Sequence, residues 1–112
     1  MKKDPKVFLA HILESIQLIE EYSKKVTAAK FYKDRAVQDA IIRRLEIIGE
    51  AVKNLPISFK TNWPDIPWKQ IAGMRDILIH EYFDVDLSLT WKVVKKELPQ
   101  IKKKLSKILS VE

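Results

Sequence analysis

The residues best suited to chemistry in this chain lie within one short segment, between Arg75 and Tyr82. It carries a guanidinium at Arg75, a carboxylate at Asp76, an imidazole at His80 and a phenol at Tyr82. A histidine titrates near neutral pH and can both take up and release a proton, and an arginine stabilises developing negative charge. This set of groups indicates acid–base chemistry at an anionic centre such as a phosphate.

The rest of the sequence argues against several other chemistries. The chain has two histidines and no cysteine, which makes a typical structural zinc site within one chain impossible. No serine stands beside His80 as a nucleophile, and two glycines in all cannot form a glycine-rich nucleotide loop. We therefore expect no metal and no cofactor.

RNA suits such a set of groups because it brings its own nucleophile. Its 2′-hydroxyl can attack the adjacent phosphate once a base removes the proton, whereas DNA lacks that hydroxyl. A metal-free nuclease of this kind would be restricted to RNA. From spacing alone one alternative stays open, an ordinary helix C-terminus whose histidine is stabilised by the helix dipole.

Helical geometry, if it holds throughout the segment, places its groups on different faces. At about 100° per residue, Asp76 and His80 share a face and can form a hydrogen bond. Arg75 and His80 then stand roughly 140° apart, so one ideal helix cannot direct both at a single phosphate. Either the helix ends near His80 and the chain turns, or a second copy supplies the missing half. The second option predicts a homodimer with a composite site.

Apolar spacing predicts four helical segments around this site. Residues recurring at three- and four-residue steps form a stripe in the first: Phe8, Ile12, Ile16, Ile19, Tyr22 and Val26. The second runs from Asp34, a plausible N-cap, to Asn54. The connection from Leu55 to Pro67 holds three prolines and is expected to be non-helical.

The second half of the chain is expected to hold the other two segments. The third begins near Trp68, with Pro67 tolerated in its first turn, and continues to Tyr82. The last runs from Leu87 towards Leu109 after an N-cap at Asp84 or Asp86, with a kink or break near Leu98 because Pro99 lies inside it. The prediction is an all-α, antiparallel bundle of four to five helices forming one domain over residues 1–112.

The net charge of +6 makes acidic partners plausible. Between Trp91 and Lys107 only Glu97 opposes seven lysines, at positions 92, 95, 96, 102, 103, 104 and 107. This run is either a solvated helix face or a sequence-blind contact surface for phosphates, and composition alone does not choose between them. No apolar stretch reaches the ~18 residues of a membrane span, and no apolar signal region follows the first residues. With cysteine absent, we expect a cytoplasmic protein.

Beyond its chemistry, the segment resembles the signature of the HEPN superfamily in its HepT-like branch: Arg75, four residues, His80, one residue, Tyr82. The resemblance covers about Phe8 to Ile101. It includes Gln38 to Ala51, Trp63 to Trp68, Ile71 to Arg75 and Phe83 to Leu87. One departure is Asp84, where the family pattern has glycine.

The resemblance implies a function and a role for each group. Arg75 and His80 would be the catalytic pair of a toxin endoribonuclease, assembled at a homodimer interface, with Asp76 orienting them. Tyr82 matches the tyrosine to which a cognate nucleotidyltransferase antitoxin transfers AMP, which silences the toxin. The partners it implies are RNA, a second copy and that antitoxin, with no metal and no membrane.

Several other conspicuous residues favour structural roles. His11, among apolar neighbours, is expected to be a partly buried packing residue. The three tryptophans, Trp63, Trp68 and Trp91, favour packing over base stacking. Glu46 and Glu50 either line a cleft or pair with nearby arginines.

Two non-enzymatic alternatives remain open at this point. One is a non-catalytic helical subunit that presents a substrate or nucleotide to a nucleotidyltransferase, and the other is a purely structural helical dimer. Whether His80 and Arg75 reach one open cleft separates these alternatives from the ribonuclease.

Overall fold

The computed structural model of the chain describes residues 4–73, 79–81 and 84–111. The helices are α1 (Pro5–Lys24), α2 (Ala28–Phe31), α3 (Arg35–Lys53), α4 (Ile57–Thr61), α5 (Trp68–Ala72), α7 (Leu87–Lys92), the π-helix η1 (Val93–Glu97) and α8 (Leu98–Val111). Two short strands, β1 (Ile79–Glu81) and β2 (Asp84–Val85), form an antiparallel hairpin. The predicted all-α class is confirmed, with this small hairpin as an addition to it.

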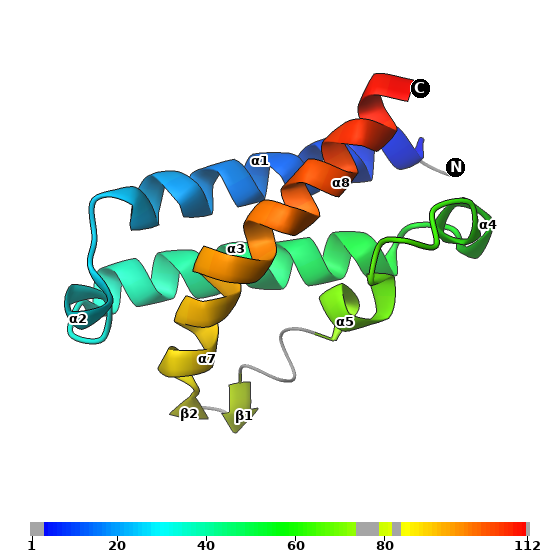
Figure 1. Cartoon of the computed structure of the whole chain (residues 1–112). Coiled ribbons are helices and arrows are strands. Elements are labelled where there is room, and N and C mark those ends of the chain that lie inside the picture. Colours follow the sequence, from blue (N-terminus) through cyan, green and yellow to red (C-terminus); the bar gives the residue numbers. More distant parts are fainter. Residues whose placement is uncertain (1–3, 74–78, 82–83, 112) are drawn as a thin grey trace.

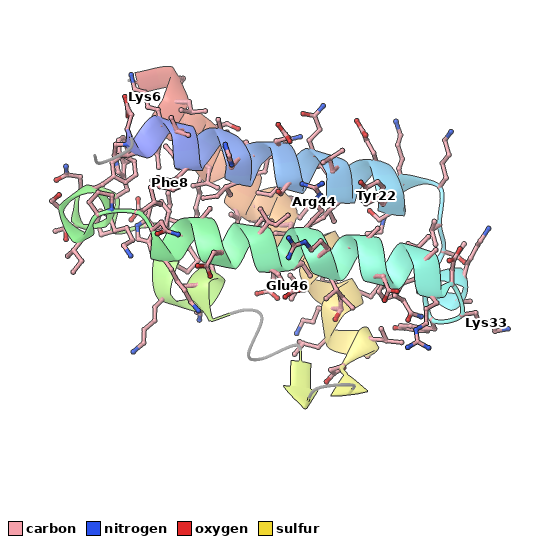
Figure 2. All side chains as sticks on the ribbon, turned by 180° about the vertical axis from the view of Figure 1, so that it is seen from behind. Lys6, Phe8, Tyr22, Lys33, Arg44 and Glu46 are labelled. Carbon is pink, nitrogen blue, oxygen red and sulfur yellow. The ribbon has the colours of Figure 1, made fainter. Side chains whose placement is uncertain are left out.

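The body of the molecule consists of three long helical stretches. Helices α1 and α3 run antiparallel, and the continuous rod of α7, η1 and α8 crosses them (Figure 1). From behind, α1 and α3 lie in front of this rod, so it covers only one face of the pair (Figure 2). The predicted antiparallel arrangement is therefore present in α1 and α3, while the rod crosses both.

The core forms where these three stretches meet. Each one turns an apolar stripe inward, and the buried members are Leu9, Ile12, Ile16 and Ile19 of α1, Ile41, Leu45, Ile48 and Val52 of α3, and Leu98, Ile101, Leu105 and Ile108 of α8. Phe8, Tyr22 and Val26 are partly buried against this core, so the predicted α1 stripe is confirmed. Burying each such aliphatic side chain contributes about 1.5–3 kcal/mol to folding.

Aspartates begin the helices at the predicted positions. The Asp34 carboxylate accepts a hydrogen bond of 3.2 Å from the Val37 N–H at the start of α3. Asp86, one of the two candidates for the last helix, accepts one of 2.9 Å from the Leu89 N–H. Both bonds satisfy N–H groups that the first helical turn leaves without a partner.

The prediction that the proline-rich connection from Leu55 to Pro67 is non-helical is wrong, because it contains α4. Pro56 occupies the N-cap of α4, where a helix needs no N–H, so the proline precedes the helix and does not interrupt it. The indole N–H of Trp68 holds the connection by donating to the carbonyls of Lys60 at 3.1 Å and Trp63 at 3.0 Å. The Phe59 ring packs beside the same indole, at 6.2 Å between centroids.

The disturbance expected near Leu98 takes the form of the π-helix η1. Pro99 has no N–H to donate to the Lys95 carbonyl, and its ring crowds that carbonyl in a regular α-helix. The preceding turn is wider, and the Leu98 N–H bonds to the Val93 carbonyl five residues back. The helical rod thus passes the proline without ending.

Trp68 allows a test of how the connection is held. We expect Trp68→Phe to lower the free energy of unfolding by about 1–3 kcal/mol, because two carbonyls lose their indole donor while most of the ring packing is kept. Urea denaturation measures this change. Ile57→Ala in α4 is the control, since Ile57 is 79% exposed. Equal stability of Trp68→Phe and wild type would show that the indole bonds do not hold the connection.

Candidate functional site

Four residues make up the site predicted from the sequence, and the structure describes one of them in part. Arg75, Asp76 and Tyr82 lie outside the described residues, while His80 lies in the backbone of β1. The candidate site is therefore defined by the elements on either side of the segment and by the backbone at His80.

The prediction of one helix from Trp68 to Tyr82 is wrong. Helix α5 ends at Ala72 with Gly73 as its C-cap, and Ile79–Glu81 is a strand. The helical placement of Asp76 beside His80 and the roughly 140° offset from Arg75 therefore do not apply. Apolar spacing could not show this, because the extended backbone pairs with β2, which comes later in the chain.

The hairpin has an irregularity at His80. Ile79 pairs with Val85 and Glu81 pairs with Asp84, so β1 advances two residues while β2 advances one. His80 is therefore the extra residue of a β-bulge. A bulge leaves its extra residue outside the regular pairing of the two strands.

The departure at Asp84 is accommodated by the hairpin. Asp84 is the first residue of β2, where the backbone is extended. Among the residues that the structure describes, no non-glycine residue has a positive φ. An extended residue does not need the conformational freedom of glycine, so the local chain path is compatible with aspartate.

Upstream of the motif, helix α5 is pressed against α3 at Gly49. A Cβ placed on Gly49 would lie 3.3 Å from the Ala72 carbonyl oxygen and 3.4 Å from that of Ile71. These atoms belong to the backbone and can retreat only if α5 moves. Ile71 and Trp68 are both buried, so α5 is also fixed by its apolar side. The segment containing Arg75 thus starts from a rigid point.

Downstream, the hairpin is joined to α7 through Asp86. The Asp86 carbonyl accepts a 2.7 Å hydrogen bond from the fully buried hydroxyl of Thr90, in addition to the cap made by its carboxylate. At the next residue, the Trp91 ring packs against Phe31, with centroids 4.9 Å apart. The strand after His80 therefore leads directly into a helix that is anchored to the core. Both α5 and the hairpin lie below α3 in Figure 1.

A groove lies between α1 and α3. It encloses about 510 Å³, and His11, Arg43, Glu46 and Glu50 are among its lining residues. His11 is exposed, so the prediction of a partly buried packing residue is wrong. Glu46 and Glu50 both line this groove between α1 and α3. In Figure 2, Arg44 and Glu46 leave α3 on different sides.

The three tryptophans have the packing roles predicted for them. Trp68 is buried, and Trp63 and Trp91 are partly buried against the core, as expected for packing residues.

Within residues 4–73, 79–81 and 84–111, no group of three or more histidine or acidic side chains is placed to hold a metal ion. No helix in these ranges is long and apolar enough to cross a membrane.

Comparison with known proteins assigns a family to this fold and motif. The family model described as "Ribonuclease HepT-like" matches residues 12–108, which include α3, the motif segment and the hairpin. The chain belongs to the HepT-like ribonuclease family.

Individual relatives agree with this membership. A protein of Thermococcus cleftensis named "Probable ribonuclease HepT" is 48% identical over 96% of this chain and 98% of its own length. A "Putative RNase" of Caldanaerobacter subterraneus is 46% identical over 98% of both chains. A protein of Methanocaldococcus jannaschii named "Gamma-glutamylcyclotransferase and putative RNase" is 58% identical, and the chain spans 49% of its length. No solved structure matches at a comparable level of significance.

Two features of this HepT-like site were missed from the sequence. The bulge at His80 has no local signal, because it is defined by pairing with β2. The close approach at Gly49 did have one: glycine costs about 1 kcal/mol relative to alanine inside a helix, and Gly49 lies deep within the segment predicted as helical. A glycine in such a position indicates a backbone neighbour.

We expect Gly49→Val to lower the free energy of unfolding by about 1–3 kcal/mol, although valine is the better helix former. The added side chain meets the α5 carbonyls, so α5 must shift. Ala36→Val, at an exposed position in the first turn of α3, is the matched control and should change stability by less than about 0.5 kcal/mol. Chemical denaturation compares the two. If Gly49→Val is as stable as wild type, α3 does not constrain the position of α5.

Proposed function

We propose that this chain is a metal-independent endoribonuclease that acts as the toxin of a type VII toxin–antitoxin system. The observation that carries the proposal is the family match over residues 12–108, which contains the Arg75–His80 pair. The names of its relatives support RNA as the substrate. The net charge of +6 is suited to a polyanionic substrate.

In the proposed reaction, His80 acts as the general base. It removes the proton of a 2′-hydroxyl, the 2′-oxygen bonds to the adjacent phosphorus, and the bond from phosphorus to the 5′-oxygen breaks. The leaving 5′-oxygen takes up a proton from water, and the products are a 2′,3′-cyclic phosphate and a 5′-hydroxyl. Arg75 stabilises the negative charge that builds on the phosphate oxygens, and Asp76 orients the pair.

The proposal includes a homodimer in which both copies contribute to the catalytic centre. Its support is the resemblance of the Arg75–Tyr82 segment to the HepT-like signature, because the helical offset that first suggested it does not apply. The path of the chain is compatible with such a site. The segment leaves α5 at Gly73 and returns through β2 to α7, so both of its ends are attached to the body of the protein.

Purified wild-type protein is expected to cleave RNA in the presence of EDTA and to leave 2′,3′-cyclic phosphate ends. Arg75→Ala and His80→Ala should each lower the cleavage rate by at least about 100-fold, because each removes a group that acts only in the transition state. Gel analysis of a labelled RNA, followed by mass spectrometry of the products, measures both effects. His11→Ala removes the other histidine and should retain wild-type activity.

Two outcomes would count against this mechanism. Activity that EDTA abolishes and Mg²⁺ or Mn²⁺ restores would assign the chemistry to a metal. A wild-type protein without cleavage activity that instead binds a nucleotidyltransferase tightly would favour the alternative, a non-catalytic partner subunit.

We further propose that the toxin is silenced by transfer of AMP to Tyr82. Tyr82 directly follows the last residue of β1, two positions after His80. AMP at this position adds a phosphate and a bulky purine beside the catalytic residues. The added phosphate competes with the RNA phosphate for the Arg75 cation, and the purine blocks access.

Co-expression with the cognate nucleotidyltransferase is expected to add mass in units of AMP to the peptide that contains Tyr82. Tyr82→Phe should lose this modification and remain toxic, because the ring is kept while the acceptor oxygen is removed. Intact-protein and peptide mass spectrometry, with growth assays of the host, provide the readouts. Modification at another residue, or neutralisation of Tyr82→Phe as complete as that of wild type, would show that Tyr82 is not the control point.

A further inference from the structure

The lysines of the last helical rod fall into two groups with different surroundings. Three of them contact other parts of the same chain. The Lys95 ammonium donates to the Ser23 carbonyl at 3.2 Å and lies over the Trp91 ring at 5.0 Å. The Lys104 ammonium donates to the Asp65 carbonyl at 3.1 Å. These charges help to fix the rod to its neighbours.

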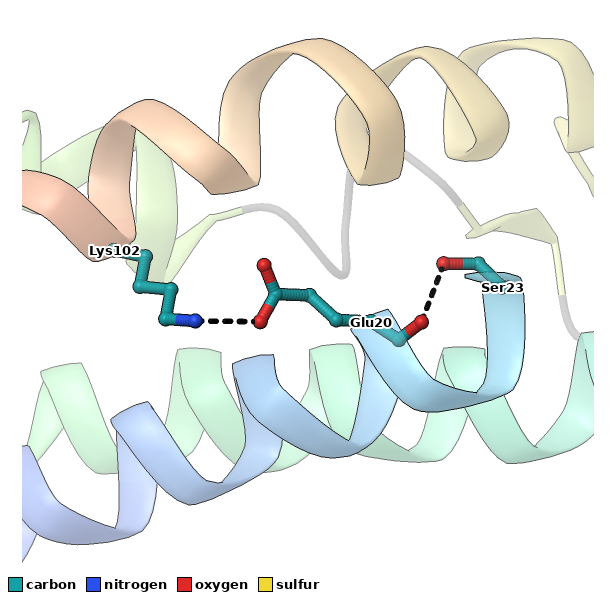
Figure 3. Close-up of polar contacts among 3 residues, drawn as sticks. All are labelled: Glu20, Ser23 and Lys102. Carbon is teal, nitrogen blue, oxygen red and sulfur yellow. Dashed lines mark hydrogen bonds and ion pairs between the residues drawn. The ribbon is translucent and has the colours of Figure 1, made fainter. Parts of the chain in front are cut away.

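Lys102 is the third member of this internal group. Its ammonium lies 2.7 Å from the Glu20 carboxylate of α1, and the two side chains are 42% and 41% exposed (Figure 3). The Ser23 hydroxyl donates to the Glu20 carbonyl one turn further along α1, at 3.4 Å. The charge of Lys102 is thus compensated by a carboxylate, and it contributes little field to the outside.

The other four lysines form a ridge on the solvent side of the rod. Lys92, Lys96, Lys103 and Lys107 are all exposed, and they follow one another at steps of four, seven and four residues. The core side of the same rod is formed by Thr90, Val93, Val94, Leu98, Ile101, Leu105 and Ile108. These four side chains therefore stand on the face directed away from the core, and we call them the lysine ridge.

The position of the lysine ridge relative to His80 is set by the chain itself. Lys92 is the last residue of α7, and a single residue, Asp86, separates α7 from β2, the partner strand of β1. The rod that carries the lysine ridge starts beside the hairpin and extends towards the C-terminus (Figure 1). With a rise of about 1.5 Å per residue, Lys92 and Lys107 are roughly 22 Å apart along the rod.

We propose that the lysine ridge binds the phosphates of the RNA strand that extends beyond the cleavage site. A row of exposed like charges repels itself, and a polyanion relieves that repulsion while releasing its counterions. Lysine offers a charge without fixed geometry, which suits a backbone of any sequence. This inference rests on the proposed ribonuclease function and assigns a binding surface outside the Arg75–His80 centre.

The test compares two fourfold variants that remove the same charge. The ridge variant is Lys92→Gln, Lys96→Gln, Lys103→Gln and Lys107→Gln. The control replaces four exposed lysines on other elements: Lys25→Gln, Lys30→Gln, Lys33→Gln and Lys53→Gln. Both are built with and without His80→Ala, so that binding is measured without cleavage. Thermal denaturation verifies that each variant folds.

Binding of a labelled single-stranded RNA of about 20 nucleotides is measured over a range of salt concentrations. The ridge variant should bind this RNA at least about tenfold more weakly than the parent. Its slope of log K against log salt should become shallower by up to about 3, because each phosphate that a lysine neutralises adds roughly 0.7 to the slope. The control variant should stay within about threefold of the parent.

Cleavage by the active proteins gives a second readout. The ridge variant should raise KM for the 20-nucleotide RNA and leave kcat unchanged, because the ridge lies outside the catalytic centre. Cleavage of a dinucleotide, which is too short to reach the ridge, should not change.

Three results would overturn the proposal. Equal losses of RNA affinity in the two variants would mean that only the overall charge matters. No loss of RNA affinity in the ridge variant would mean that the ridge is a solvated helix face without a binding role. Ridge-dependent binding to phosphatidylglycerol vesicles in place of RNA would assign the surface to a membrane. The inference is separable from the proposed function: a protein that cuts no RNA but binds it through the ridge refutes only the ribonuclease.

Discussion

Three apolar helix faces, from α1, α3 and the rod ending in α8, exclude water from a common core, and every other feature depends on that packing. The side chains that meet there are mostly isoleucine and leucine with essentially no exposed surface. Dense packing of this kind has few alternative arrangements, so the three stretches act as a rigid frame. The short elements α2, α4, α5 and the hairpin derive their positions from it, since each is too short to be stable alone.

The motif segment depends on this frame at both of its ends. At one end Gly49 lets the last carbonyls of α5 approach α3, and at the other Asp86 and Thr90 fix the start of α7 directly after β2. A catalytic group needs to be held within a fraction of an ångström, and rigid elements provide this better than an unsupported loop. Between these two ends, the bulge at His80 shifts the pairing of β1 with β2 by one residue.

The lysines of the rod differ in whether they contact other segments of the chain. Lys95, Lys102 and Lys104 are directed at carbonyl or carboxylate oxygens of other segments and help to fix the rod to α1 and to the α4–α5 connection. Such exposed interactions contribute little to stability individually, about 0–1 kcal/mol for an ion pair. Of these three lysines, only Lys102 has its charge compensated by a carboxylate, so the outward positive charge of the rod comes from the lysine ridge together with the exposed Lys95 and Lys104.

The sequence alone determined the helical class, the long helices and the Asp34 cap. These features depend on neighbours within a turn or two, which local spacing and capping rules describe. The same rules failed where residues distant in sequence meet. The predicted helix continued from α5 through His80, because pairing with β2 leaves no signal in the residues of β1. His11 was predicted to be partly buried, but it faces the groove between α1 and α3. The division of the lysines is a tertiary property for the same reason: their partners, Ser23, Glu20 and Asp65, lie 39 to 82 residues away along the chain. Composition gives the number of lysines, whereas the folded structure decides which of them contact other segments of the chain.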